Sequence, residues 1–138
     1  MRINLVLLLL LSAGSLFAVS NEDIRAIMDK TNASVEDAIF VIYSIDNPDA
    51  VLADLDSISN TRISALNKDS NLDAGSLALI AIELKKAGGG IIYNLSGLAR
   101  YAAESLVYDG IYPAGFSWNR EISGTELIEL STVIKNWK

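Results

Sequence analysis

The sequence has no cysteine and no histidine among its 138 residues. Without cysteine the chain forms no disulfide, offers no thiolate nucleophile and cannot be a lipoprotein anchored through a modified cysteine. Without histidine it has neither a Ser-His-Asp triad nor a histidine-ligated metal site. Pairs of carboxylates remain as a catalytic option, but nothing in the sequence brings two acids together in an apolar pocket. We therefore expect no enzyme, and a small carboxylate hydrolase is the weakest of three functional hypotheses.

Two segments resemble ligand loops without meeting the requirements of one. The run 67–73, NKDSNLD, spaces its acids and amides like the first ligands of an EF-hand. However, Leu72 stands where glycine is needed, and Ala78 stands where the bidentate glutamate is needed. The three glycines at 88–90 lack the lysine of a phosphate loop and indicate the end of a helix. The sequence therefore predicts no metal site and no cofactor.

The first twenty residues have the pattern of a secretory signal. Arg2 gives a positive start, residues 5–11 are an unbroken apolar run, and Ala18-Val19-Ser20 fits the site of signal peptidase. The run is shorter than the roughly 20 apolar residues that span a membrane. We expect residues 1–20 to be cleaved and the protein to be exported to the periplasm or cell surface, with no membrane span left. The alternative is an uncleaved N-terminal anchor.

Basic residues are scarce, since 11 Lys and Arg stand against 17 Asp and Glu, giving a formal charge of −6. Arg2 is the only charged residue in 1–20, so the remainder carries −7. DNA, RNA and anionic lipid would repel such a chain, and nucleic acid is not an expected partner. The acids crowd between Asp29 and Asp73, a pattern that is typical of solvated helix faces.

Proline is rare, and apolar residues recur at helical spacing, which predicts an all-α domain of about six short helices. The expected helix starts are Asn21, Ser34 with Asp37 in a capping box, Asn47-Pro48, Asp73 and Ser123 with Glu126. The expected core faces are Ile24, Ile27 and Met28; Val35, Ala38, Ile39 and Ile42; Val51, Leu52, Leu55 and Ile58; residues 77–84; Leu98, Tyr101, Ala102, Ser105 and Leu106; and Leu127, Leu130, Val133, Ile134 and Trp137. Residues 91–93 are the best candidate for a strand.

The segment from Leu98 reads LARYAAESLVYDGIYPAGFSWNREISGTELIEL and resembles an S-layer homology (SLH) module. The residues at the family spacing are Ala99, Ala102, Leu106, Val107, Gly110 and Ile111, then Gly115 and Phe116 in the loop, then residues 122–127 on the family's Ile-Thr-Arg-Ala-Glu-Phe. A looser match extends the resemblance to about 92–136. The resemblance implies a helix-loop-helix module at 92–138, after an acidic helical region at 21–91, and attachment to cell-wall polysaccharide.

In SLH domains that bind polysaccharide, the arginine of this motif contacts an anionic sugar, whereas Gly124 stands in its place here. We expect Trp118 to stack on a sugar and Arg120 to supply the cation. Ser123 and Gly124 would present backbone N–H groups at the positive end of the last helix. The alternative function is an envelope protein–protein interaction subunit that keeps the helical scaffold and has lost glycan binding. Phe116 is expected to fold back onto the core.

The sequence also suggests a divergent internal repeat. LDAGSL at 72–77 lies over ISGTEL at 122–127 when the chain is shifted by fifty residues. Repeated helix pairs would also fit a short α-solenoid, which is the alternative fold. SLH modules usually work in threes, within one chain or by assembly, so a homo-oligomer is compatible with the resemblance.

Overall fold

The computed structural model describes residues 21–138, and the predicted signal at 1–20 lies outside them. The described chain is helical, which confirms the predicted all-α class. The elements are α2 (Asn21–Met28), α3 (Val35–Asp46), the 3-10 helix η1 (Leu52–Ser57), α4 (Thr61–Ser64), α5 (Ala74–Lys85), α6 (Gly90–Ser96), α7 (Ala99–Tyr108) and α8 (Gly124–Lys135). Within 21–138 no helix has both the length and the apolar character that a membrane crossing requires.

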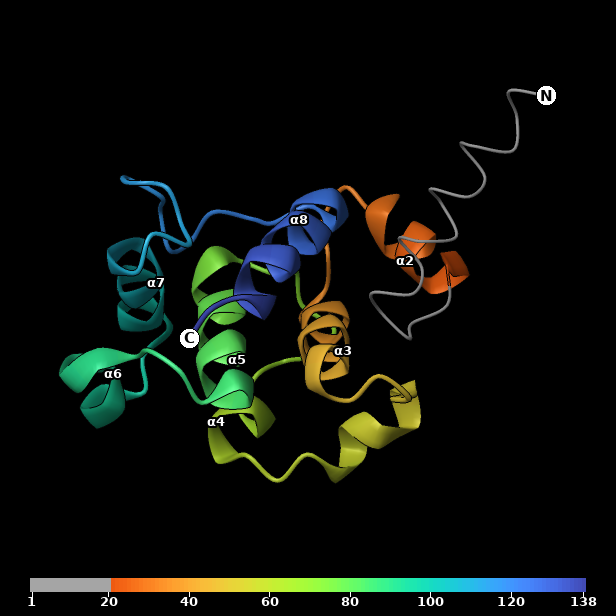
Figure 1. The fold of residues 1–138 in the computed structure, drawn as a ribbon, viewed down its shortest axis with the longest axis horizontal. Coiled ribbons are helices and arrows are strands. Elements are labelled where there is room, and N and C mark those ends of the chain that lie inside the picture. Colours follow the sequence, from red (N-terminus) through yellow and green to blue (C-terminus); the bar gives the residue numbers. More distant parts are fainter. Residues whose placement is uncertain (1–20) are drawn as a thin grey trace.

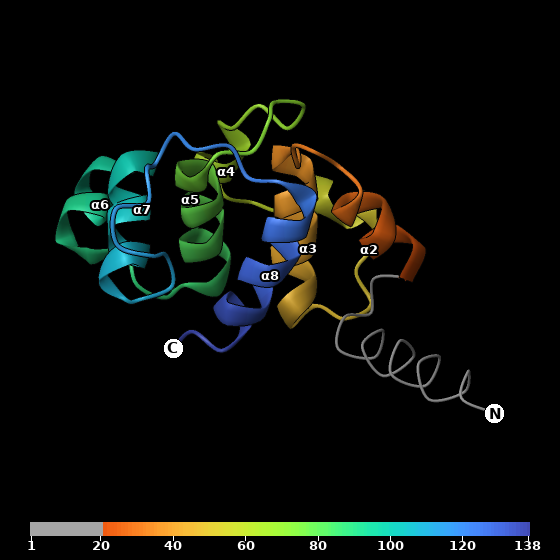
Figure 2. The same cartoon turned by 90° about the horizontal axis from the view of Figure 1, so that it is seen from above.

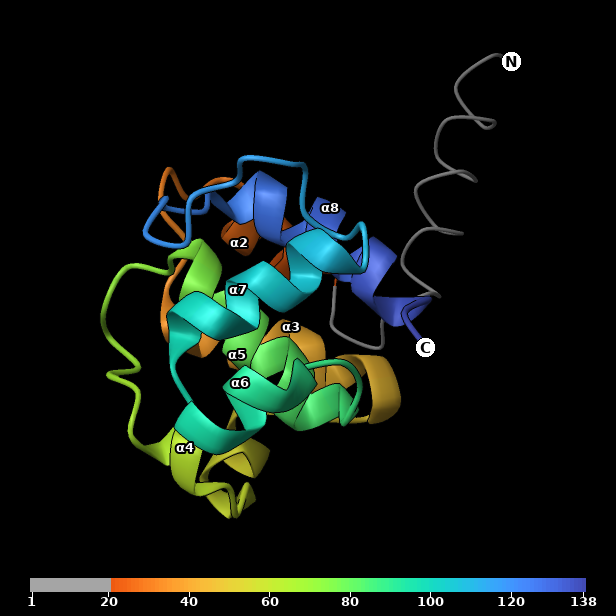
Figure 3. The ribbon, with the colours of Figure 1, turned by 90° about the vertical axis from the view of Figure 1, so that its left-hand side faces the viewer.

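Three helices form the middle of the molecule. Figure 1 shows α3, α5 and α8 at the centre, with α6 and α7 on one side and α2 on the other. The view from above gives the same order (Figure 2), and α6 and α7 form the outer layer of their side when that side faces the viewer (Figure 3). Because α2 packs against α8, the first and last described helices are neighbours. The helices therefore close on one another and do not stack as an open solenoid, in which each repeat touches only the next.

The central position of α5 follows from its composition. Its residues are apolar around almost the whole circumference, and residues 77–82 are all buried. A helix without a polar face has to be covered on every side, and α7 and α3 supply most of that cover. One hydrophobic core contains side chains from both the 21–91 and the 92–138 regions, including Ile39, Leu77 and Leu106.

The segments that precede α3, α5 and α8 meet in a closed ring of backbone hydrogen bonds. The Leu72 N–H donates to the Ala33 carbonyl at 2.7 Å. The Ile122 N–H donates to the Leu72 carbonyl, and the Ala33 N–H donates to the Ile122 carbonyl, each at 2.9 Å. All three residues are fully buried, so these bonds satisfy polar groups that water cannot reach. We call Ala33, Leu72 and Ile122 the hydrogen-bond ring.

Each ring residue is followed directly by the cap of a helix. The caps, with the backbone N–H groups that they accept from, are Ser34 with Asp37, Asp73 with Ser76, and Ser123 with Glu126. These three predicted starts are confirmed, and Ser34 with Asp37 forms the complete capping box. Leu72 and Ile122, which coincide when the sequence is shifted by fifty residues, occupy equivalent places in the ring. Ala33 takes the third place, which the sequence did not indicate.

Three local predictions were wrong. Residues 91–93 belong to α6 and form no strand, because a short apolar run fits either element and tertiary packing decides. Asn47 ends α3 as its C-cap, so Asn47-Pro48 starts no helix, and η1 begins at Leu52. The expected apolar faces are also only partly buried: Leu55, Leu106 and Ile134 are in the core, whereas Leu52 and Leu98 are more than half exposed.

Candidate functional site

The loop before α8 holds Arg120 in contacts within the chain. Its guanidinium makes two hydrogen bonds to the Glu126 carboxylate, at 2.6 and 3.0 Å. The central carbon of this guanidinium lies 4.6 Å from the centre of the Phe116 ring. A two-point contact between Arg and a carboxylate is a strong form of ion pair. Arg120, the cation that was predicted to contact an anionic sugar, is therefore paired with Glu126. Because the Glu126 side chain faces Arg120, it does not complete the predicted capping box with Ser123.

The start of α8 is covered by the end of α2. The Gly124 N–H donates to the Lys30 carbonyl at 3.0 Å, and the Thr125 hydroxyl donates to the Met28 carbonyl at 3.2 Å. A Cβ placed on Gly124 would lie 1.6 Å from the Ile27 carbonyl oxygen. Gly124 thus allows a close approach, as glycine does, but the group that approaches is the chain's own backbone. The space that the sequence reserved for a ligand at Ser123 and Gly124 is filled by α2.

Of the loop aromatics, Trp118 keeps a free surface. The residue is 44% exposed, while its backbone carbonyl accepts a hydrogen bond from the Gly75 N–H at 2.7 Å. Phe116 is partly buried and packs on Tyr112, with ring centres 4.7 Å apart. The structure therefore brings Trp118, Arg120, Ser123 and Gly124 together at one loop–helix junction, where Trp118 and Arg120 are both exposed and the Arg120 guanidinium is paired with Glu126.

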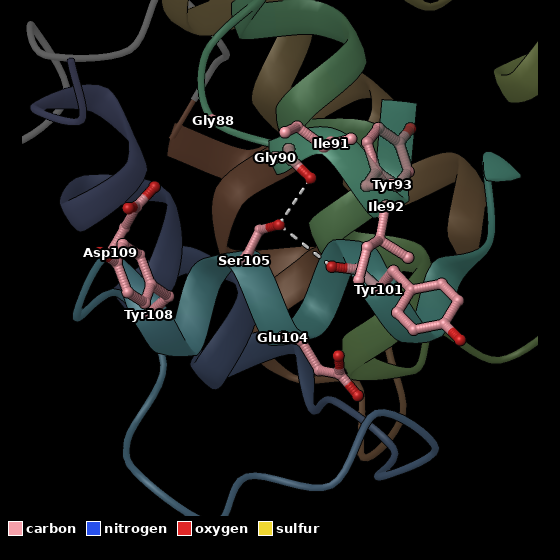
Figure 4. A pocket seen from close by; sticks show the side chains of 11 residues that line it. Gly88, Gly90, Ile91, Ile92, Tyr93, Tyr101, Glu104, Ser105, Tyr108 and Asp109 are labelled. Atoms are coloured by element: carbon pink, nitrogen blue, oxygen red, sulfur yellow. Dashed lines mark hydrogen bonds between the residues drawn. The ribbon is translucent and has the colours of Figure 1, made fainter. Parts of the chain in front are cut away.

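A more open concave surface lies between α6 and α7 (Figure 4). This α6–α7 groove has a volume of about 400 Å³. Its lining comprises Gly88, Gly89, Gly90, Ile91, Ile92, Tyr93, Tyr101, Glu104, Ser105, Tyr108 and Asp109. The helical spacing predicted Tyr101 and Ser105 as core positions and gave no indication of this groove. The signal that could have indicated it is a second tyrosine, Tyr108, seven residues after Tyr101 on the same helix face.

Three consecutive glycines with positive φ, Gly88, Gly89 and Gly90, lead into the groove wall, and Gly90 is the first residue of α6. Gly88 also lies beneath Trp137, because a Cβ there would come 2.2 Å from a carbon of the indole ring. The Trp137 indole N–H donates to Asp109 at 3.0 Å, which ties the C-terminal end to one end of the groove. The Ser105 hydroxyl reaches the Gly89 carbonyl at 2.9 Å and joins the two walls, as Figure 4 shows.

A network of polar side chains centred on Glu83 fixes α6 to the rest of the molecule. The Glu83 carboxylate accepts from the Tyr93 hydroxyl at 2.6 Å, from Arg62 at 2.9 Å and from Asn60 at 2.8 Å. Arg62 also donates to the Asn94 carbonyl at 2.9 Å. These contacts link α4, α5 and α6, so the α6 wall of the groove is held by hydrogen bonds and by the burial of Tyr93.

The network shifts the pKa values of its members in opposite directions. Burial alone would raise the pKa of Glu83, but the hydrogen bonds from Asn60, Tyr93 and Arg62 outweigh it and lower that pKa. Burial, together with the hydrogen bond to Glu83, raises the pKa of Tyr93 to about 12. Near neutral pH, Glu83 is therefore charged and Tyr93 is a neutral donor, which is the pairing that the hydrogen bonds require.

The groove offers surfaces for binding. Tyr108 is 92% exposed, and Ile91 and Ile92 are 79% and 60% exposed, so aromatic and aliphatic faces are open to solvent together. Glu104 and Asp109 are exposed carboxylates that can accept hydrogen bonds. Within residues 21–138, no group of three acidic side chains is arranged to hold a metal ion.

These features describe an open groove with tyrosines at two positions of one wall, aliphatic side chains on the other, and carboxylates between and beside the tyrosines. The other predicted site, at the start of α8, is occupied by contacts within the chain. When the chain is compared with protein families, with curated proteins and with solved structures, none of the three comparisons finds a match.

Proposed function

We propose that this chain is an exported, non-catalytic cell-envelope protein that attaches to cell-wall polysaccharide. The observation that carries the proposal is the α6–α7 groove, in which the exposed Tyr108 and the partly buried Tyr101 stand beside carboxylates. Sugar rings have apolar faces, which pack on aromatic rings, and rims of hydroxyl groups, which donate to carboxylates. A groove that is open to solvent suits a chain of sugars, because a polymer can enter without threading its end.

Two features of the sequence support the envelope setting. The pattern of residues 1–20 predicts export, and residues 92–136 resemble an SLH module. The structure adds a scaffold in which three capped helices start from one hydrogen-bond ring. Because Arg120 and Gly124 have partners within the chain, we place the polysaccharide contact in the α6–α7 groove and not at the start of α8.

Sedimentation with purified cell-wall sacculi tests this function. The mature protein is mixed with sacculi that retain their secondary polymers, and the pellet and supernatant are assayed for protein. We expect the wild-type protein to pellet. Trp118→Ala and Arg120→Ala serve as controls outside the groove, and we expect both to pellet like the wild type. A wild-type protein that stays in the supernatant would contradict wall attachment.

A second candidate function is an envelope protein–protein interaction subunit. The observation that favours it is the apolar surface of α6 and its flank, where Leu95 is 83% exposed and Leu98 is 56% exposed. Neighbouring exposed apolar residues often mark a contact with another protein. This function predicts no wall binding by the wild-type protein and a loss of complex formation in Leu95→Ser, measured by cross-linking in envelope extracts.

A further inference from the structure

We infer that the α6–α7 groove binds an extended, β-linked glycan of uncharged sugars, with one sugar ring on Tyr101 and another on Tyr108. This inference rests on the proposed function and deepens it, because it names the site and the class of sugar. It differs from the anionic sugar that the SLH resemblance implies. Three properties of the groove carry it: the spacing of the tyrosines, the apolar α6 wall and the sign of the charges.

The spacing of the tyrosines fits alternate rings of a straight sugar chain. Tyr101 and Tyr108 are seven residues apart on α7, which is two helical turns, so both lie on one face. At a rise of 1.5 Å per residue, their positions are about 10 Å apart along the helix axis. In an extended β-1,4-linked glycan, every second sugar faces the same way, at a comparable repeat. Figure 4 shows the two rings at opposite ends of the α7 wall, with Glu104 and Ser105 between them.

The groups between and beside the tyrosines match the rim of such a chain. Glu104 is exposed on the same wall and can accept hydrogen bonds from sugar hydroxyls. One oxygen of Asp109 accepts from Trp137, which orients the carboxylate and leaves its second oxygen for a ligand. The Ser105 hydroxyl already donates to the Gly89 carbonyl, so it contributes to the shape of the floor.

The α6 wall suits sugars that carry an apolar substituent. Ile91 and Ile92 are 79% and 60% exposed at this wall. Packing a methyl group of the ligand against these side chains removes apolar surface from contact with water, which favours binding. An N-acetyl group supplies that methyl together with an amide, whose N–H can donate to Glu104 or Asp109. Acetylated amino sugars are therefore the best match within the uncharged class.

The charges of the groove oppose an anionic polymer. Among its lining residues, the charged side chains are Glu104 and Asp109, and both are acids. The neighbouring cation, Arg100, lies 3.4 Å from the Glu104 carboxylate and 5.9 Å above the Tyr101 ring. Arg100 therefore offsets one of the two negative charges, and the groove remains acidic. A carboxylate or phosphate on the glycan would meet like charge there.

Calorimetric titration with defined oligosaccharides tests the inference. The probes are β-1,4-linked N-acetylglucosamine oligomers of increasing length, with oligogalacturonate as the anionic comparison. We expect affinity to rise with length until the oligomer spans both tyrosines, and oligogalacturonate not to bind. Tyr108→Ala should lower the affinity roughly tenfold, as expected for losing one aromatic stacking contact. Tyr108→Phe keeps the ring and should stay close to the wild-type affinity.

Two controls separate a lost site from a lost fold. Tyr108 is 92% exposed, so Tyr108→Ala should leave the melting temperature unchanged. Trp118→Ala removes an exposed aromatic ring outside the groove and should bind like the wild type. Binding of an uncharged glycan should also persist at about 1 M salt, where charge interactions are screened within roughly 3 Å.

The outcomes distinguish the groove from the wall function. If the wild type and Tyr108→Ala pellet equally well with sacculi, the protein attaches to the wall, but the groove is not the site of attachment. If the protein binds the oligomers through Tyr101 and Tyr108 but does not pellet, the groove stands and wall attachment fails. Tighter binding of oligogalacturonate would overturn the sugar class. Absence of any glycan binding, with cross-linking of a protein through α6, would overturn both proposals.

Discussion

Among the described glycines, Gly124 is the one with the least room for a side chain. An added Cβ would lie 1.6 Å from the Ile27 carbonyl oxygen, so Gly124→Ala must push α2 away from α8. We expect this variant to lose about 3 kcal/mol or more of unfolding free energy, although alanine has the higher helix propensity. Urea denaturation measures the change.

Gly75→Ala is the matched control for Gly124→Ala, because Gly75 also lies in the first turn of a central helix. Its added Cβ would lie 3.1 Å from Ala99 and from the Trp118 carbonyl, so these neighbours have to move by only a few tenths of an ångström. We expect a change within about 1 kcal/mol. Equal costs for the two variants would show that α2 does not approach α8 as closely as described.

Glu83 should make the unfolding free energy depend on pH in the acidic range. Its pKa is lowered in the folded protein, so Glu83 stabilises the fold above the ordinary carboxyl value of 4.5, and this contribution is lost as pH falls through the lowered pKa. Glu83→Gln removes the charged acceptor of three hydrogen bonds and should cost about 1–3 kcal/mol at neutral pH. Urea denaturation should show that difference shrinking as the pH falls below 4.5 and through the lowered pKa of Glu83.

The exposed Glu129 gives the matched control for the acid effect. Glu129→Gln changes the net charge by the same amount, but its carboxylate lies on the solvent side of α8. We expect its unfolding free energy to follow that of the wild type at every pH. A pH dependence in Glu83→Gln that matches the wild type would contradict the role of the Glu83 network.

At the scale of elements, α7 depends on a single buried stripe. Leu106 is fully buried on α7, together with Ala102 and Ala103, and α7 packs against α5. Leu106→Ala should cost about 2–5 kcal/mol through lost burial and the cavity left behind. Chemical denaturation followed by circular dichroism measures it. A change below about 0.5 kcal/mol would mean that the stripe is exposed.

Helical periodicity was sufficient to predict the three central helices, α3, α5 and α8. The caps at Ser34, Asp73 and Ser123 were predictable because each is followed by an apolar-periodic run. The sequence could not place α6, because three apolar residues in a row after glycines fit a strand as well as a helix. It also could not distinguish the exposed Leu98 from the buried Leu106, since both fall on the same predicted stripe.

The candidate site was harder to predict because it depends on contacts between distant segments. No residue close to Gly124 in the sequence indicates that Ile27 and Lys30 cover it. The pairing of Arg120 with Glu126 depends on how the loop turns into α8, which the sequence does not show. Tyr101 and Tyr108 were visible as a pair seven residues apart. The groove beside them depends on the position of α6, which follows three positive-φ glycines and is held by the Glu83 network.

At the scale of the whole molecule, the shared core predicts a single unfolding transition. Both tryptophans, Trp118 and Trp137, lie in the 92–138 region, whereas helices occur along the entire described chain. Tryptophan fluorescence therefore reports the C-terminal region, and far-ultraviolet circular dichroism reports all helices. We expect the two urea midpoints to coincide, as in two-state unfolding. Separate midpoints would show that the two regions unfold independently.

The hydrogen-bond ring also determines when the chain can finish folding. Its members are far apart in the sequence, and the last of them, Ile122, lies close to the C-terminus. A chain that emerges from its N-terminal end leaves the Ala33 N–H and the Leu72 carbonyl without partners until the start of α8 has been made. Loop closure over such separations slows folding. A chain made from its N-terminal end therefore completes this core only once residues as late as Ile122 have been synthesised.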